Sequence, residues 1–160
     1  MNENQAIAKI AAYCAKAERC RYDVCKKLTT WELSPEVAER IIKYLEKENF
    51  LNEERFCQSF IKDKLRFNKW GKNKIVFELR KKQISETLIH ASFEELDIED
   101  EFEAPLMALL EKKVRTVKAA NEYELRMKLA RFAAGRGFGY ELVQKCLHKL
   151  LKPTDDGSFF

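Results

Sequence analysis

Residues 75–96 read IVFELRKKQISETLIHASFEEL, and this stretch contains the pattern that decides the fold. Measured from Ile84, apolar residues lie nine and five positions earlier, at Ile75 and Leu79, and four positions later, at Leu88. Such spacing places side chains on one face of a helix. The stretch therefore predicts two amphipathic helices joined by a short turn just before Ile84.

The same template fits twice more, with Leu33 and Phe138 in the place of Ile84, so that the three anchors are 51 and 54 residues apart. The matching apolar residues are Val24, Leu28, Val37 and Ile42 around Leu33, and Leu129, Ala133, Leu142 and Leu147 around Phe138. The residue after each anchor is Ser34, Ser85 or Gly139, and all three types are acceptable helix N-caps. Each anchor is therefore expected to precede a helix and to pack as a hydrophobic staple.

A third helix is predicted before each pair, because apolar residues recur there at intervals of three and four. Asn52 and Asn121 are the expected N-caps of helices that follow them. We therefore predict an all-α fold of three tandem three-helix, helix-turn-helix-like repeats in an elongated, curved arrangement. The expected parts are repeats at 1–51, 52–97 and 98–153 and an acidic-aromatic C-terminal tail at 154–160. Trp31 and Tyr44 are expected in the core.

Composition agrees with a helical domain and excludes several classes of protein. The 160 residues are 46% hydrophobic and 35% charged, which suffices for a core. With 5 Gly and 3 Pro, a many-stranded β-sandwich is not expected. No apolar run is long enough to span a membrane, and no secretory signal is visible at the start. The 5 Cys form no Cys-x-x-Cys pair, which favours reduced thiols in the cytoplasm and no metal site.

Charge is distributed unevenly along the chain. Residues 62–82 contain nine basic and two acidic side chains, whereas residues 94–103 contain seven acidic and no basic ones. A basic centre beside an acidic joint is typical of a protein with a polyanionic or acidic partner.

Three stretches carry a likeness to a known family: FLNEERF at 50–56, GKNKIVFELRKKQI at 71–84, and Arg136-Gly137-Phe138. In this order and at these separations they resemble the RecX family of bacterial recombination regulators, and the likeness covers about residues 6–151. One departure is Gln83, where the family more often has glycine, a residue suited to a left-handed turn.

The resemblance implies a function as well as a fold. RecX proteins bind the RecA filament along its helical groove and usually depress RecA ATP hydrolysis, strand exchange and coprotease activity in DNA repair and the SOS response. Several also bind single- or double-stranded DNA directly. The family is not catalytic, so no enzyme activity and no cofactor are expected. We also expect a monomer without a membrane partner.

The candidate contacts with RecA or DNA are basic residues of the central run and of the turn before Phe138: Arg66, Lys69, Lys72, Lys74, Arg80, Lys81, Lys82, Arg131 and Arg136. Bases at a helix end also suit the helix dipole, so a purely structural role is the alternative. Trp70 is a candidate aromatic contact, or else covers the seam between helices. Gly71 is expected as a turn residue or cap, and Gly135, Gly137 and Gly139 as turn residues. Arg136 either caps the preceding carbonyls or contacts a partner.

Three other functions remain open at this point. The last two helices of each repeat resemble a helix-turn-helix, which would make a DNA-binding protein that acts without RecA. Acids such as Glu36, Glu86 and Glu141 on the second helices argue against a basic recognition face. An enzyme lacks any visible nucleophile–base pair or nucleotide loop. A helical scaffold for another acidic partner is the third alternative. The tail could also be a short docking peptide.

Overall fold

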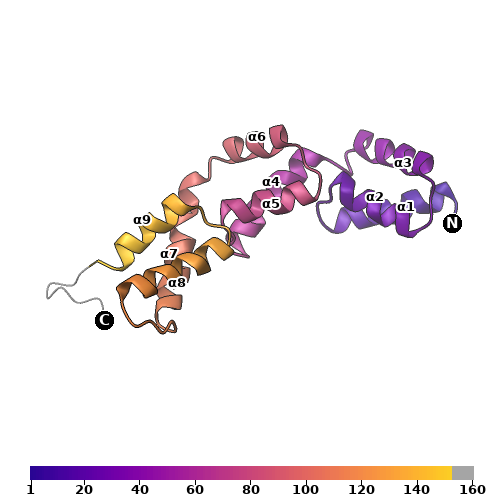
Figure 1. Ribbon diagram of the computed structural model, residues 1–160. Helices are drawn as coiled ribbons and strands as arrows, with labels where there is room; N and C mark the ends of the chain where they lie inside the picture. The colour runs from indigo at the N-terminus through magenta and orange to yellow at the C-terminus, as the bar shows by residue number, and fades with distance from the viewer. Residues whose placement is uncertain (153–160) are drawn as a thin grey trace. The chain divides into compact units, whose positions relative to one another are not determined.

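The computed structural model describes residues 1–152, and all regular secondary structure in this part of the chain is helical, with no strand (Figure 1). Its elements in chain order are α1 (Glu3–Lys16), α2 (Arg21–Thr30), α3 (Pro35–Lys47), α4 (Glu53–Arg66), α5 (Lys72–Lys81), α6 (Glu86–Leu96), the 3-10 turn η1 (Glu99–Glu101), α7 (Glu103–Val114), α8 (Glu122–Gly135) and α9 (Tyr140–Leu150). The predicted all-α class is confirmed. The tail predicted at 154–160 lies outside the described residues.

The chain forms two compact units. The first, called unit 1, consists of residues 1–60 and 79–95, and the second, unit 2, consists of residues 61–78 and the described residues from 96 onward. Each unit is therefore built from two separate stretches of sequence. α4 and α5 contribute residues to both units.

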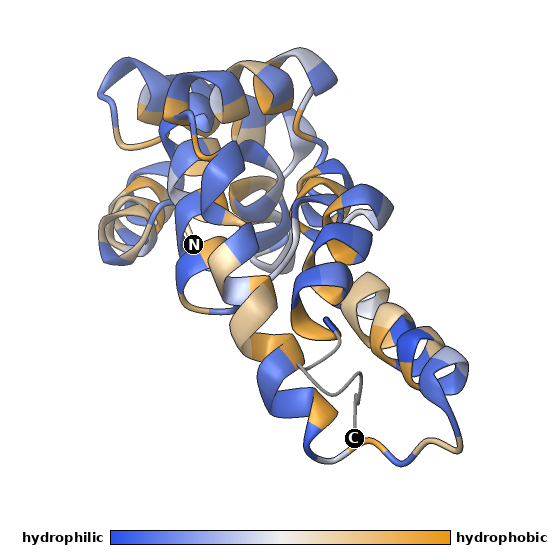
Figure 2. Ribbon diagram, turned by 90° about the vertical axis from the view of Figure 1, so that its left-hand side faces the viewer, coloured by the Kyte–Doolittle hydropathy of each residue, from blue (hydrophilic) through white to orange (hydrophobic). Residues whose placement is uncertain are grey.

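The core of unit 1 lies among α1, α2 and α3, which contact one another. Its largest fully buried side chains in these helices are Ile10, Leu28, Ile41 and Leu45. Figure 2 shows how hydrophobic and hydrophilic residues share each helix, as expected for helices that bury one face.

Two aromatic residues expected in this core have different outcomes. Trp31 packs against the core, as predicted. Tyr44 is 41% exposed, so its predicted core position is wrong. The inward face of α3 is made by Ile41, Ile42 and Leu45, and Tyr44 falls beside that face.

The core of unit 2 lies among α7, α8 and α9, which likewise contact one another. Leu106, Leu110 and Leu129 are fully shielded from solvent there, and Leu147 of α9 joins them. Ile75, from the part of α5 that belongs to this unit, is also fully buried.

The turn before each anchor has the same geometry in all three repeats. Glu32, Gln83 and Gly137 have φ angles of 61°, 61° and 94°. The backbone N–H of the anchor then donates to the carbonyl five residues earlier: Leu33 to Leu28 at 3.4 Å, Ile84 to Leu79 at 3.1 Å, and Phe138 to Ala133 at 3.1 Å. This is the Schellman closure of a helix. Gln83 therefore adopts the left-handed conformation that favours glycine, although the residue is glutamine.

Side-chain caps begin the helices where the sequence predicts them. Ser34 Oγ accepts from the Val37 N–H at 3.3 Å, and Ser85 Oγ accepts from the Leu88 N–H at 3.1 Å. Asn121 Oδ1 accepts from the Glu124 N–H at 2.8 Å. These bonds satisfy N–H groups that a helix leaves unpaired at its start.

Candidate partner-binding surface

Trp70 lies between two lysines in unit 2. The Lys64 Nζ is 4.9 Å and the Lys74 Nζ 4.6 Å from the centroid of the Trp70 ring. An ammonium group at such a distance from a tryptophan ring is attracted to the π electrons. We call Lys64, Trp70 and Lys74 the Trp70 cluster, which presents positive charge around a partly buried aromatic ring.

The end of α4 explains how the Trp70 cluster forms. Lys69 has a φ of 57°, and this left-handed residue turns the chain back on itself. The Trp70 N–H then donates to the Lys64 carbonyl, six residues earlier, at 3.1 Å, and this bond satisfies a carbonyl that the end of α4 leaves unpaired. Lys64 is absent from the candidates named from sequence. Its signal would have been a position six residues before a tryptophan, which becomes informative only if Lys69 is known to be left-handed.

Two glycines place α5 against the turn between α8 and α9. The Gly71 N–H donates to the Arg136 carbonyl at 2.8 Å, and the Asn73 N–H donates to the Gly137 carbonyl at 2.9 Å. The Gly71 carbonyl accepts from Ile75 at 3.2 Å, so the predicted role of Gly71 as a cap is confirmed. The same contact fixes the start of the helix that carries Lys74.

The other basic side chains at the end of α4 and the start of α5 form exposed ion pairs or hydrogen bonds. Arg66 pairs with Glu101 at 3.2 Å, and Lys72 pairs with Glu99 at 2.5 Å. Ion pairs with this much exposure contribute little to stability and exchange readily with other charged groups. The Lys69 Nζ donates to the Arg66 carbonyl at 2.6 Å.

The bases at the end of α5 belong to unit 1 and differ in their surroundings. Arg80 is exposed and pairs with Glu86, while Lys81 is exposed as well. Lys82 pairs with Asp23 at 2.7 Å, and the two side chains are only 29% and 17% exposed. Burial raises the pKa of Asp23, but hydrogen bonds from Lys82 and Cys20 outweigh it and hold that pKa below its usual value. Lys82 is therefore tied into the structure of unit 1.

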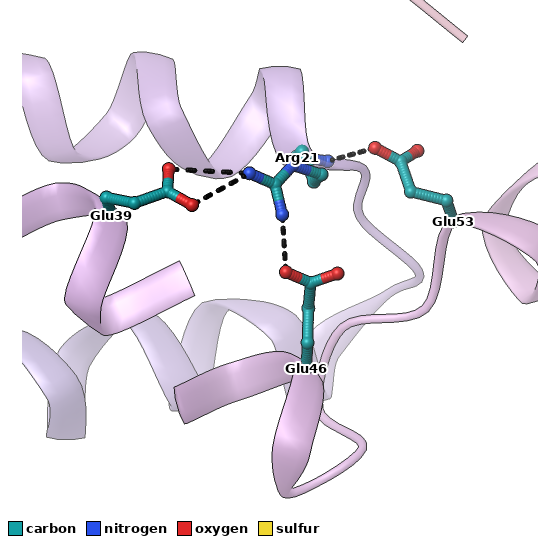
Figure 3. Close-up of polar contacts among 4 residues, drawn as sticks. All are labelled: Arg21, Glu39, Glu46 and Glu53. Atoms are coloured by element: carbon teal, nitrogen blue, oxygen red, sulfur yellow. Dashed lines mark hydrogen bonds and ion pairs between the residues drawn. The ribbon is translucent and has the colours of Figure 1, made fainter. Parts of the chain in front are cut away.

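A second charged cluster in unit 1 surrounds Arg21, at the start of α2 (Figure 3). Its guanidinium group binds Glu46 and, at 3.2 Å, Glu39, both on α3. Its backbone N–H donates to Glu53 Oε1 of α4 at 3.0 Å. One residue thus connects the start of α2 to two further helices, and its charge is surrounded by carboxylates.

The two candidate arginines of the third repeat have different surroundings. Arg131 is exposed on α8. Arg136 ends α8, where its backbone N–H donates to the Phe132 and Ala133 carbonyls. Its guanidinium carbon lies 5.9 Å from the Phe132 ring centroid.

Within residues 1–152 no group of three or more His, Cys, Asp and Glu side chains is arranged to hold a metal ion. In the same range no helix is both long and apolar enough to cross a membrane.

The fold and this surface define a class of protein, namely a tandem three-helix repeat protein with a basic, tryptophan-centred surface. Residues 52–92 match the family model of the second three-helix domain of RecX, and residues 99–147 match that of the third. The chain belongs to the RecX family.

Individual relatives agree with this assignment. The chain is 31% identical over 137 residues to the regulatory protein RecX of Clostridium perfringens (strain SM101 / Type A), and 30% identical over 135 residues to that of Clostridioides difficile (strain 630). Each alignment covers 84% of this chain and 63% of the relative, so the chain spans less than two thirds of their length.

Solved structures show the same fold. A crystal structure of regulatory protein RecX superposes with a TM-score of 0.81 at 20% identity, covering 90% of this chain and 72% of that one. The crystal structure of RecX from Lactobacillus salivarius also gives a TM-score of 0.81, at 17% identity, with 92% of this chain and 96% of that one covered.

Proposed function

We propose that this protein binds RecA nucleoprotein filaments in their helical groove and inhibits RecA ATP hydrolysis, strand exchange and coprotease activity. The observation that carries the proposal is the Trp70 cluster, in which two ammonium groups flank one indole ring. A nucleoprotein filament offers phosphates and acidic side chains together, and cations recognise both. Tryptophan and basic side chains are also the residue types that anchor interfaces.

The surrounding bases widen this surface. Lys69 lies beside the Trp70 cluster in sequence, and Arg66 and Lys72 exchange their exposed carboxylate partners for filament groups at little free-energy cost. Arg80 and Lys81 of unit 1 are proposed as separate contacts with the filament, apart from this surface. Lys82 is held by its ion pair with Asp23, so we expect it to contribute less to filament binding than Arg80 and Lys81.

The mechanism is occupancy of the groove. A protein built from repeats that bridges adjacent RecA protomers obstructs incoming duplex DNA and hinders the motions tied to nucleotide turnover. In this proposal the protein is a non-catalytic monomer of the bacterial cytoplasm. Its three repeats lie at 1–51, 52–97 and 98–153. Direct binding to DNA is part of the proposal at the Trp70 cluster, where a base can stack on the indole.

A charge-matched pair of variants tests these contacts. The first combines Lys69→Gln, Lys74→Gln and Lys81→Gln, since glutamine removes the positive charge but keeps a polar side chain of similar length. The control combines Lys43→Gln, Lys47→Gln and Lys112→Gln, which are exposed positions outside the proposed surface. Each variant is titrated into preformed RecA–single-strand-DNA filaments while ATP hydrolysis is followed.

We expect the wild-type protein to inhibit ATP hydrolysis and the first variant to need about tenfold more protein for the same effect. The control variant should stay within about twofold of wild type. No effect of the wild-type protein at saturation would refute the function. Equal losses in both variants would refute the surface, because net charge alone would then explain binding. Tight, sequence-specific duplex binding without RecA would favour the helix-turn-helix alternative.

A further inference from the structure

α8 carries a second apolar face that the core of unit 2 does not use. Its buried face is made by Leu125, Leu129 and Ala133. A different stripe, at intervals of four, three and four residues, consists of Tyr123, Met127, Ala130 and Ala134. These intervals align side chains along one side of a helix. Tyr123 and Met127 are 74% and 46% exposed, so the stripe faces solvent.

This stripe forms one wall of a groove within unit 2. The groove has a volume of about 680 Å³, and Phe138, Tyr140 and Val143 line it from the turn and from α9. Tyr140 is 78% exposed, whereas Phe138 and Val143 are buried and form the floor. The space accommodates several large side chains of a partner. None of the residues of the Trp70 cluster lines it.

The composition of the groove is that of a protein–protein contact. Aromatic residues, methionine and arginine are enriched at the centres of such interfaces, while lysine and glutamate are depleted. The lining contains two tyrosines, one methionine and two arginines, with no lysine and no carboxylate. A contiguous exposed apolar surface of this kind marks an interaction site.

The charges of the groove specify the partner. Arg126 and Arg131 are the only charged lining residues, and on α8 they lie on opposite edges of the apolar stripe. Arg126 pairs with Glu122 at 2.8 Å, while Arg131 forms no ion pair with another residue of the described range 1–152. A ligand with carboxylates on both sides of an apolar ridge is complementary to this arrangement.

We propose that the groove between α8 and α9 binds an amphipathic helix of a partner protein, whose apolar ridge is flanked by acidic side chains. A helix presents anchors at i, i+3 or i+4 and i+7, which match a groove between two helices. An extended peptide added to a sheet edge is not an alternative for residues 1–152, which contain no strand. This site goes beyond the filament contacts proposed above.

The test uses two synthetic, fluorescein-labelled helical peptides with leucine at the i, i+3, i+4 and i+7 positions. One has glutamate at the remaining positions and the other has lysine, so that only charge differs. Binding to the full chain is measured by fluorescence anisotropy. The variants are Met127→Glu in the apolar stripe and Arg131→Glu at its edge. The control is Lys112→Glu, on the exposed surface of α7 and outside the groove.

We expect the acidic peptide to bind at least about tenfold more tightly than the basic one. Met127→Glu should remove binding, Arg131→Glu should reduce or reverse the preference for acidic charge, and Lys112→Glu should change neither. Circular dichroism confirms that each variant is folded. Equal affinity for both peptides, or acidic-peptide binding that survives Met127→Glu, would overturn the proposal.

A chain ending at Lys152 tests the competing occupant, which is the chain's own acidic-aromatic segment from 153 to 160. Unchanged peptide affinity supports an external partner. A gain of about tenfold or more would show that this segment occupies the groove, and would overturn the assignment to a partner helix.

Discussion

Gly71 and Gly137 touch through their backbones. A Cβ on Gly71 would lie 2.3 Å from the carbonyl carbon of Gly137, and a Cβ on Gly137 would lie 2.3 Å from the Cβ of Lys74. No carbon atom fits at such distances, so this approach requires glycine on both sides. The contact holds the start of α5 against the turn between α8 and α9 within unit 2.

Alanine at Gly71 should therefore destabilise the protein. We expect Gly71→Ala to lower the free energy of unfolding by about 1–3 kcal/mol, because the added methyl group forces two backbone segments apart. Urea denaturation followed by circular dichroism measures the change. Gly135→Ala is the matched control, since a Cβ there meets nothing within 4 Å and the residue lies in α8. That change should stabilise by about 0.5–1 kcal/mol. Shifts of the two variants in the same direction would contradict the close-approach argument.

The left-handed turn at Gln83 offers a stabilising substitution. An L-residue at a φ of 61° carries strain of about 1–2 kcal/mol, which glycine removes. Part of this gain is offset because glycine also has more conformational entropy in the unfolded chain. Gln83→Gly should raise the free energy of unfolding by about 0.5–1 kcal/mol. Gln83→Ala, which keeps a Cβ, is the control and should gain nothing. A destabilised glycine variant would show that the Gln83 side chain matters more than its backbone.

The Asp23–Lys82 pair should make stability depend on pH. The pKa of Asp23 is lowered in the folded protein, so its contribution exists above the unfolded pKa of about 3.9 and is lost as the pH falls through the folded value. The pKa of Lys82 is raised, so the contribution of that side is lost only as the pH rises through its folded value. Asp23→Asn should cost about 1–2 kcal/mol at pH 7, an amount already reduced for partial exposure, and little near pH 2.

Urea denaturation of wild type and Asp23→Asn at several pH values measures this difference. Glu86→Gln, which removes the fully exposed partner of Arg80, is the control and should change stability little at any pH. A difference between wild type and Asp23→Asn that stays constant from pH 2 to 7 would mean that charge is not the cause.

The thiols should divide into two classes. Burial raises the pKa of Cys14, Cys57 and Cys146, and raises that of Cys20 to about 12, while Cys25 is exposed. A buried thiol with a raised pKa reacts slowly, because the thiolate is the nucleophile. Ellman's reagent at pH 8 should therefore modify one thiol quickly in the native protein and all five after denaturation. Cys25→Ser should remove the fast reaction; a fast reaction that persists would contradict the burial of the other four.

The helices and their caps could be predicted from sequence because their signals are local. The spacing around Ile84 repeats around Leu33 and Phe138, and Ser34, Ser85 and Asn121 cap helices where their types suggest. The Trp70 cluster could be predicted only in part, because the position of Lys64 depends on the backbone of Lys69. A positive φ at lysine has no local signal, since lysine is not a residue that favours it.

Contacts between distant residues were harder to predict. The approach of Gly71 to Gly137 joins positions that no periodic pattern relates. The apolar groove beside α8 was missed for another reason. Its stripe shares a helix with the core face of Leu125 and Leu129, and a pattern of apolar residues does not reveal which of two faces a neighbouring helix covers.

The contact between Gly71 and Gly137 has a consequence for synthesis. The ribosome releases α5 well before the turn that α5 must meet, so unit 2 cannot close while the chain is being extended through α8. Bringing together two positions so far apart along the chain has an entropic cost of loop closure, and the formation of a single helix does not have this cost. The start of α5 should therefore remain without its contact until the turn between α8 and α9 has emerged from the ribosome.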